Sequence, residues 1–273
     1  MTTPLKAKHR DIWASGDYAA VAADVIPDLG SVLVQAAGVG PGQRVLDVAA
    51  GTGNAAIPAA LAGASVTASD LTPELLAAGE KLAEARGAVL DWVAADAEDM
   101  PFGTGEFDVV LSCVGVMFAP FHQAAAGELV RVCRPGGTIA LLNWTPAGFV
   151  GQLFAAMKPF AAPPPAGAQP PPLWGDEEHV RELLGDRVTG VSARTGSVRV
   201  ERFAEPGDFR RYFRDNYGPT LAVYRSLAGD PDRTAALDAA LDELAGRFRA
   251  ADGSMRWEYL LLTATRSGGP ATP

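Results

Sequence analysis

The stretch that decides the fold of this chain is Val45-Leu46-Asp47-Val48-Ala49-Ala50-Gly51-Thr52-Gly53-Asn54. It predicts an apolar strand that carries one acid, Asp47, and then breaks at a Gly-x-Gly loop. The small residues of 55–63 follow and predict a helix. Because glycine lacks a Cβ, its backbone can approach a bound molecule where another residue would clash. The pattern is therefore typical of a strand–loop–helix cradle for a nucleotide.

Strands and helices alternate from this cradle toward the C-terminus. Apolar runs predict strands at 44–48, 65–69, 89–94, 107–112 and 138–143. Thr72 and Pro73 predict a helix start, with threonine as the N-cap and proline at the first helical position. A further helix is expected over 122–133. Such alternation implies a parallel sheet with helices on both faces.

The regular alternation stops after residue 145. Seven prolines within 159–175 predict an extended loop with polyproline II character. The remaining pattern predicts helices at 176–184, 205–226 and 230–250, and strands at 188–193, 197–203 and 257–265. Ahead of the sheet, residues 9–39 are expected to form two helices that act as a cap.

Three acids lie in or just after three successive predicted strands: Asp47, Asp70 and Asp96. The carboxyl ends of parallel strands share one edge of a sheet, where ligands bind. Asp70 lies nineteen residues after Gly51, the spacing expected for an acid that accepts hydrogen bonds from both ribose hydroxyls. An ionised carboxylate suits a diol because it only accepts hydrogen bonds.

Together these motifs resemble those of class I S-adenosylmethionine-dependent methyltransferases, the small-molecule, type 11-like group. The resemblance covers roughly residues 43–145, and it includes the run 107–113 and the segment 128–137 before the fifth strand. It implies that the cofactor is S-adenosyl-L-methionine and the product S-adenosyl-L-homocysteine. The cofactor-binding residues that it implies are Asp47, Ala49, Gly51, Thr52, Gly53, Asn54, Asp70, Leu71, Asp96, Ala97 and Cys113.

The resemblance also implies the architecture. We expect an α/β fold with a Rossmann-like, seven-stranded, mostly parallel sheet and helices on both faces. Residues 1–40 are expected to form an N-terminal helical cap, and residues 41–273 the methyltransferase domain. Within that domain, 146–185 and 204–250 are expected to form lid insertions.

Two other functions fit the same glycine loop. Residues 51–56 satisfy the G-x-G-x-x-G/A fingerprint of NAD(P)-dependent oxidoreductases, with Asp70 correctly spaced. Asp47 counts against that interpretation, because its charge would lie near a pyrophosphate instead of a cationic amino group. The third possibility is a non-catalytic protein that binds S-adenosylmethionine.

The acceptor side is marked less clearly by the sequence. His122 follows the fourth strand and is the first candidate for a general base, ahead of His9 and Asp17. Residues expected around the acceptor or in a lid are Trp13, Tyr18, Met117, Asn143 and Trp144. Ser112-Cys113-Val114-Gly115 lacks the Asn/Asp-Pro-Pro-aromatic signature of methyltransferases that act on amino groups. A small apolar or aromatic metabolite, methylated on oxygen or carbon, is therefore expected.

The composition of the chain limits the classes of molecule that it is expected to bind. The formal net charge of −9 argues against nucleic acid, whose phosphates require clustered Lys and Arg. Two cysteines, Cys113 and Cys133, form no metal or redox motif, so no metal is expected. The first ten residues carry charges and predict no signal peptide, and no apolar run is long enough for a membrane span. We expect a cytoplasmic monomer or homodimer that acts on a small molecule.

Overall fold

A computed structural model describes residues 3–268. Their strands form one seven-stranded sheet in the order β3-β2-β1-β4-β5-β7-β6. The parallel strands are β1 (Arg44–Val48), β2 (Ser65–Asp70), β3 (Asp91–Ala94), β4 (Phe107–Cys113) and β5 (Cys133–Trp144). β7 (Met255–Arg266) runs antiparallel between β5 and β6 (Val188–Val200). The predicted α/β fold with a mostly parallel seven-stranded sheet is confirmed.

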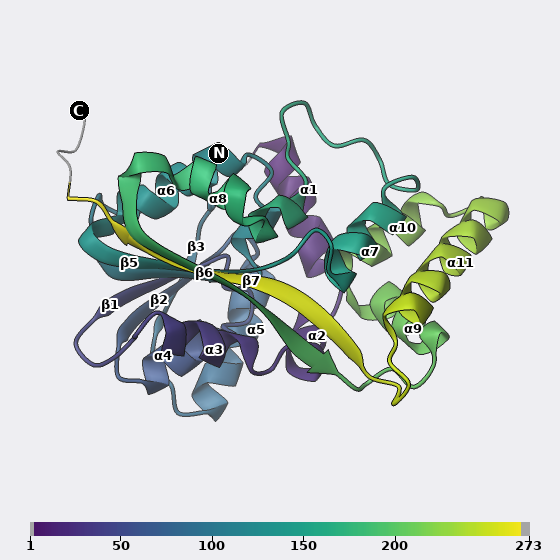
Figure 1. Cartoon of the computed structure of the whole chain (residues 1–273), viewed down its shortest axis with the longest axis horizontal. Coiled ribbons are helices and arrows are strands. Elements are labelled where there is room, and N and C mark those ends of the chain that lie inside the picture. Colours follow the sequence, from purple (N-terminus) through teal and green to yellow (C-terminus); the bar gives the residue numbers. More distant parts are fainter. Residues whose placement is uncertain (1–2, 269–273) are drawn as a thin grey trace.

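Helices cover both faces of the sheet (Figure 1). One face carries α3 (Leu29–Ala36), α4 (Ala56–Leu61) and α5 (Pro73–Ala85), and the other carries α6 (His122–Val132) and α8 (Glu177–Leu184). Because the central strand β4 is covered on both sides, six of its seven residues are buried. This explains the nearly continuous apolar run that predicted the strand.

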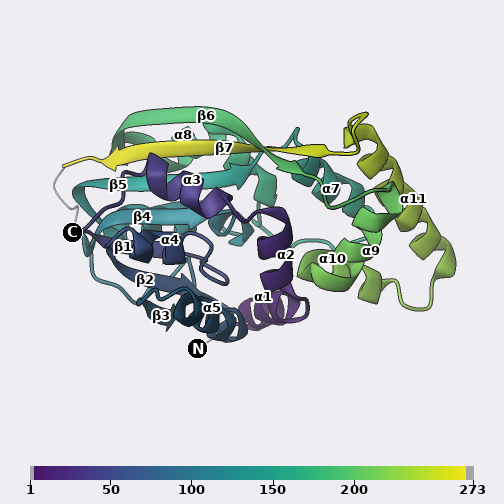
Figure 2. The same ribbon diagram turned by 90° about the horizontal axis from the view of Figure 1, so that it is seen from below.

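The other helices gather beyond the carboxyl ends of the parallel strands (Figure 2). They are α1 (Pro4–Ala14), α2 (Tyr18–Val25), α7 (Phe149–Met157), α9 (Pro206–Asn216), α10 (Gly218–Ser226) and α11 (Pro231–Phe248). The first residues of β7 reach into this group, where Trp257 stacks on Phe149 with ring centroids 4.8 Å apart. The stacked pair fastens the helical end to the sheet.

Some helices of the expected cap and lid segments cover a face of the sheet, and others lie over its carboxyl edge. α3, which lies within the expected cap, packs on α4, β4 and β5 and belongs to a sheet-covering layer. α8 lies within an expected lid segment but packs on α6. Only α1 and α2 of the N-terminal stretch, and α7 and α9 to α11 of the later segments, lie over the carboxyl edge of the sheet.

Three predicted elements are wrong in detail. Residues 9–39 form parts of three helices instead of two. The helix expected at 205–226 is two helices that meet at Tyr217, because Pro219 has no N–H to donate and restricts the residue before it. The strands expected at 188–193 and 197–203 are one strand, β6, in which Gly196 packs under the Tyr259 ring; a Cβ there would lie 2.5 Å from Tyr259 Cζ.

Three short 3₁₀ helices complete the chain: η1 (Val116–Phe118), η2 (Pro171–Gly175) and η3 (Gly185–Arg187). Within residues 3–268, no single helix is long and apolar enough to cross a membrane, and the one apolar pair, α2 and α3, is bent by 72°.

Candidate functional site

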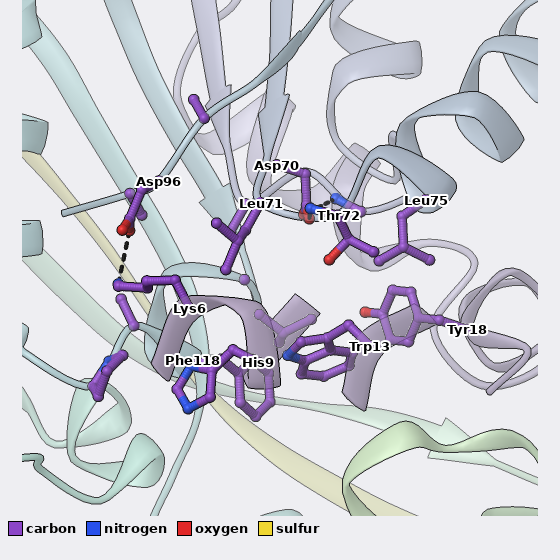
Figure 3. Close-up of a pocket in the computed structure, with 18 residues that line it drawn as sticks. Lys6, His9, Trp13, Tyr18, Asp70, Leu71, Thr72, Leu75, Asp96 and Phe118 are labelled. Carbon is purple, nitrogen blue, oxygen red and sulfur yellow. Dashed lines mark hydrogen bonds and ion pairs between the residues drawn. The ribbon is translucent and has the colours of Figure 1, made fainter. Parts of the chain in front are cut away.

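A pocket lies at the carboxyl ends of β1, β2, β3 and β4, with α1 on the side opposite these strand ends (Figure 3). Its volume is about 640 Å³ when the space at its mouth is counted. Eight of the predicted site residues line it: Trp13, Tyr18, Ala49, Gly51, Asp70, Leu71, Asp96 and Ala97. The strand ends thus come together as the sequence predicts.

The floor of the pocket is made by unusual backbone. Among the described residues, only two that are not glycine have positive φ, Ala49 at 53° and Val114 at 47°. Both line the pocket, directly after β1 and β4. Gly115 is required beside them, since a Cβ there would lie 2.2 Å from the Ala49 carbonyl oxygen. Strained backbone of this kind clusters at ligand-binding sites.

Asp70 ties the glycine loop to the end of β2. Its Oδ2 accepts a hydrogen bond from the Gly51 N–H at 2.8 Å, and its Oδ1 accepts one from the Thr72 N–H at 2.8 Å. Burial raises the pKa of Asp70, and these backbone N–H groups oppose the shift. Each carboxylate oxygen keeps a second lone pair, so the side chain can hold the loop and still accept from a diol in the pocket.

Asp47 lies beneath the pocket and does not line it. Its side chain is 1% exposed, and neither carboxylate oxygen has a hydrogen-bond partner among the described residues. Burial raises the pKa of Asp47 to about 8; the nearby backbone N–H of Ala56 opposes this without meeting hydrogen-bond geometry. A buried carboxylate without a partner is costly, so the raised pKa keeps this group mostly protonated at pH 7 in the cofactor-free chain.

Asp96 is held by α1. Lys6 Nζ lies 2.8 Å from Asp96 Oδ1 and 2.6 Å from Glu98 Oε2 (Figure 3). The Glu98 N–H also donates to Asp96 Oδ1, at 3.0 Å. No hydrogen bond within residues 3–268 reaches Asp96 Oδ2, which leaves this oxygen available to an amino group in the pocket.

The segment after Asp96 is fixed by α6. The Met100 N–H donates to Glu128, while Arg131 donates to the carbonyls of Met100 and Phe102. Glu128 and Arg131 also pair with each other, at 2.6 Å. Residues 96–102 and the family-like segment 128–137 are therefore joined by hydrogen bonds, which help to fix the position of Asp96.

Three aromatic side chains, here called the aromatic lid, close the pocket: Trp13, Tyr18 and Phe118. Trp13 packs edge-on against Tyr18 and Phe118, with ring centroids 5.5 and 4.7 Å apart. All three line the pocket, so α1, α2 and η1 supply an apolar cover. Trp13 and Tyr18 come from the N-terminal stretch, as the sequence analysis expects of a lid.

Several predicted cofactor residues do not line the pocket. Asn54 donates its side-chain N–H to the Ile26 carbonyl at 3.2 Å, which fastens the loop to the end of α2. Gly53 has φ of 85°, and its missing Cβ makes room for Trp92, whose ring would lie 2.8 Å away. Thr52 and Cys113 are buried. In the described chain these four residues shape or support the loop, and their predicted contact with the cofactor stays a prediction.

Three of the residues predicted to lie around the acceptor also do not line the pocket. Met117 and Asn143 are fully buried and line no pocket described here, and the Asn143 Oδ1 has no hydrogen-bond partner among the described residues. Trp144 lines a separate aromatic cavity of about 350 Å³, which shares Tyr18 and Phe118 with the pocket.

His122 lies away from the pocket. Its ring is fully buried between α6 and α8, with Nδ1 2.9 Å from His179 Nε2 and the Trp174 ring centroid 5.4 Å away. Burial, followed by the charge of His179, lowers the pKa of His122 to about 4. This placement speaks against a role as general base, because the imidazole does not reach the space where an acceptor would bind.

We expect His122 to make stability depend on pH. The folded chain keeps this imidazole neutral while the unfolded chain protonates it near pH 6.5, so stability should fall as pH drops from about 6.5 to about 4. Its share is on the order of 2 kcal/mol. In His122→Gln, the difference in unfolding free energy between pH 7 and pH 4.5, measured with urea, should shrink by about that amount. An unchanged difference would assign the pH dependence to another group.

Sequence reasoning missed about half of the pocket. Lys6, Val114, Gly115 and Phe118 line it without having been assigned a site role, and His9 was ranked below His122. The further lining residues are Thr72, Leu75, Ala95, Ala119 and Pro120. The one available signal was position: Val114 to Pro120 directly follow the fourth strand, at the ligand-binding edge.

This pocket is of the kind in which doubly wound α/β proteins bind a nucleotide cofactor. A methyltransferase-domain family model matches residues 46–141. An uncharacterised protein of Mycobacterium tuberculosis is 52% identical over 258 residues, 94% of each chain. A demethylmenaquinone methyltransferase of Renibacterium salmoninarum is 38% identical over 114 residues, 42% of this chain and 46% of that protein.

Among solved structures, phosphoethanolamine N-methyltransferase 2 of Haemonchus contortus, in complex with S-adenosyl-L-methionine, superimposes with a TM-score of 0.55. It is 15% identical, over 87% of this chain and 52% of that one, so this likeness concerns the fold. The chain therefore shares a family with the mycobacterial protein and carries a methyltransferase domain over residues 46–141, and its fold is that of the class I S-adenosylmethionine-dependent methyltransferases.

Proposed function

We propose that this protein binds S-adenosylmethionine in the pocket of Figure 3 and transfers its methyl group to oxygen or carbon of a small, apolar or aromatic metabolite. The observation that carries the proposal is the convergence of Gly51, Asp70 and Asp96, from three separate strand ends, on one pocket. Each supplies what one portion of the cofactor requires.

The residues fit the cofactor portion by portion. Asp70 retains lone pairs for the ribose hydroxyls, and Asp96 Oδ2 is free to accept from the adenine amino group. Gly51, with φ of 56°, lets the backbone approach the amino-acid portion. The unpaired carboxyl group of Asp47 lies below that loop, where a cationic amino group would stabilise its ionised form and a pyrophosphate would not. This last point favours S-adenosylmethionine over a nicotinamide dinucleotide.

S-adenosylmethionine supplies a methyl group that its sulfonium has already activated. The protein's part is then to align the acceptor and to exclude water, which the aromatic lid of Trp13, Tyr18 and Phe118 performs. His9 lines the pocket, and burial with the nearby charge of Lys6 lowers its pKa. A neutral imidazole in that place can take a proton from an acceptor hydroxyl or carbon, the role first expected of His122.

Calorimetry tests the cofactor. We expect adenosylhomocysteine to bind at least roughly tenfold more tightly than NADH, because only its amino group complements Asp47. Equal or tighter binding of NADH would overturn the proposal in favour of an oxidoreductase. Label from methyl-labelled S-adenosylmethionine should then appear in an apolar hydroxy-aromatic such as naphthol. Binding of the cofactor with no label in any acceptor of this class would favour the non-catalytic alternative.

A further inference from the structure

A second and larger cavity lies next to the cofactor pocket. It is enclosed by α1, α7, α10 and the proline-rich segment 161–171, and its volume is about 1370 Å³ with the space at its mouth. Its walls come from outside the sheet, from the segments that distinguish this chain from a bare cofactor-binding domain. Without the open space at its mouth, the cavity holds about 440 Å³, within the usual 300–1000 Å³ of small-molecule sites. Its lining runs along α7 and α10, so it suits an elongated ligand.

The two cavities share a wall. Four residues line both of them: His9, Trp13, Phe118 and Pro120. Trp13 and Phe118 belong to the aromatic lid, and their rings meet edge-on with centroids 4.7 Å apart. A ligand in the larger cavity is therefore separated from the cofactor pocket by a wall of these rings, His9 and Pro120.

The lining of the larger cavity is apolar with a positive rim. Its body is formed by side chains such as Phe154, Met157 and Val223. The charged side chains that line it are Lys8 and Lys158, together with the titratable His9, and no carboxylate lines it among the described residues. Neither lysine forms an ion pair within residues 3–268, and both are exposed. In a chain of net charge −9, an acid-free cavity with two free cations is selective for charge.

We propose that this cavity, here called the acceptor cavity, binds a methyl acceptor with an elongated apolar body and one acidic group, a carboxylate or phenolate. The acidic group lies at Lys8 and Lys158, the body lies along α7 and α10, and the atom that receives the methyl group lies at the Phe118 end. The assignment of the cavity to the acceptor rests on the proposed function. The preference for an apolar acid rests on the lining alone.

Decanoate and decanol, below micelle-forming concentrations, test charge and shape separately. We expect decanoate to bind the full chain roughly five- to tenfold more tightly than decanol, as two partly exposed ion pairs allow. The double variant Lys8→Gln/Lys158→Gln should lose this preference and leave decanol binding unchanged. Lys81→Gln, at an exposed lysine of α5 that lines no pocket described here, is the matched control and should behave like the wild type.

Ala222→Trp tests the place of binding, because Ala222 lines the acceptor cavity on α10 and is absent from the cofactor pocket. It should abolish binding of both decanoate and decanol and preserve binding of adenosylhomocysteine. Equal affinities of the two ligands in the wild type, or decanoate binding that survives Ala222→Trp, would overturn the proposal. The lysine variants alter exposed residues and report on charge even where Ala222→Trp fails to fold. If the wild type fails to bind adenosylhomocysteine, the proposed function is refuted, whereas the preference of the cavity for an apolar acid is not.

Discussion

Replacing Asp70 by alanine is expected to reduce the affinity for adenosylhomocysteine by roughly 100-fold, about 3 kcal/mol, and to leave the chain folded. The carboxylate accepts from the Gly51 and Thr72 N–H groups at 2.8 Å each, so its loss removes the ribose acceptor and releases the glycine loop together. The two N–H groups then lack a partner, which should lower stability by about 1–2 kcal/mol. Calorimetry and urea unfolding measure the two effects.

Asp108→Ala is the matched control for this variant. Asp108 also accepts from a backbone N–H, that of Arg44 at 2.7 Å, and it pairs with Arg134. It stands near the start of β4, at the opposite edge of the sheet from the pocket. We expect a comparable loss of stability with unchanged binding of adenosylhomocysteine. Full affinity in Asp70→Ala would remove Asp70 from the ribose site.

The cradle is predictable because its signals are local. An apolar strand of five residues, a glycine loop and a helix start all depend on neighbours in the chain, and the sheet then brings Asp70 and Asp96 to the same edge. Even so, the same local rule assigned Asn54 and Gly53 to the cofactor. In the cofactor-free chain these two residues contact Ile26 and Trp92, and their contact with the cofactor stays a prediction.

The roof of the pocket is not predictable because it depends on contacts between distant parts of the chain. Lys6 meets Asp96 across ninety residues, and nothing in the local sequence of α1 marks that pair. Positive φ at Val114 is equally unmarked in the sequence, since valine has no intrinsic preference for this conformation. His122 was chosen for its nearness to a strand end along the chain, but its helix turns the ring toward His179.

Asp47→Asn, like Asp70→Ala, is expected to weaken cofactor binding, but it should raise the stability of the chain instead of lowering it. The Asp47 carboxylate is 1% exposed and has no hydrogen-bond partner among the described residues. Its pKa is about 8 in the folded chain, against 3.8 for the free side chain. Between these values the folded state holds a proton that the unfolded state has released, so this group lowers stability as pH rises from about 4 to about 8.

Asparagine carries no charge, so the variant should escape this penalty, which is on the order of 5 kcal/mol at pH 8 and small near pH 4. Urea unfolding of the cofactor-free chains at both pH values measures the difference. A variant less stable than the wild type at pH 8 would show that the carboxylate is compensated within the fold.

The same substitution should weaken adenosylhomocysteine binding by roughly tenfold, because a neutral amide no longer attracts the amino group of the ligand. At pH 7 the wild-type carboxyl is mostly protonated, and an ammonium placed near it favours the ionised form. Binding to the wild type should therefore release up to one proton, detected as a dependence of the calorimetric enthalpy on the ionisation enthalpy of the buffer. Asp47→Asn should bind without that proton. Equal proton release by both chains would place the amino group beyond the influence of Asp47, and the unpaired carboxylate would then have a cost in stability with no return in cofactor binding.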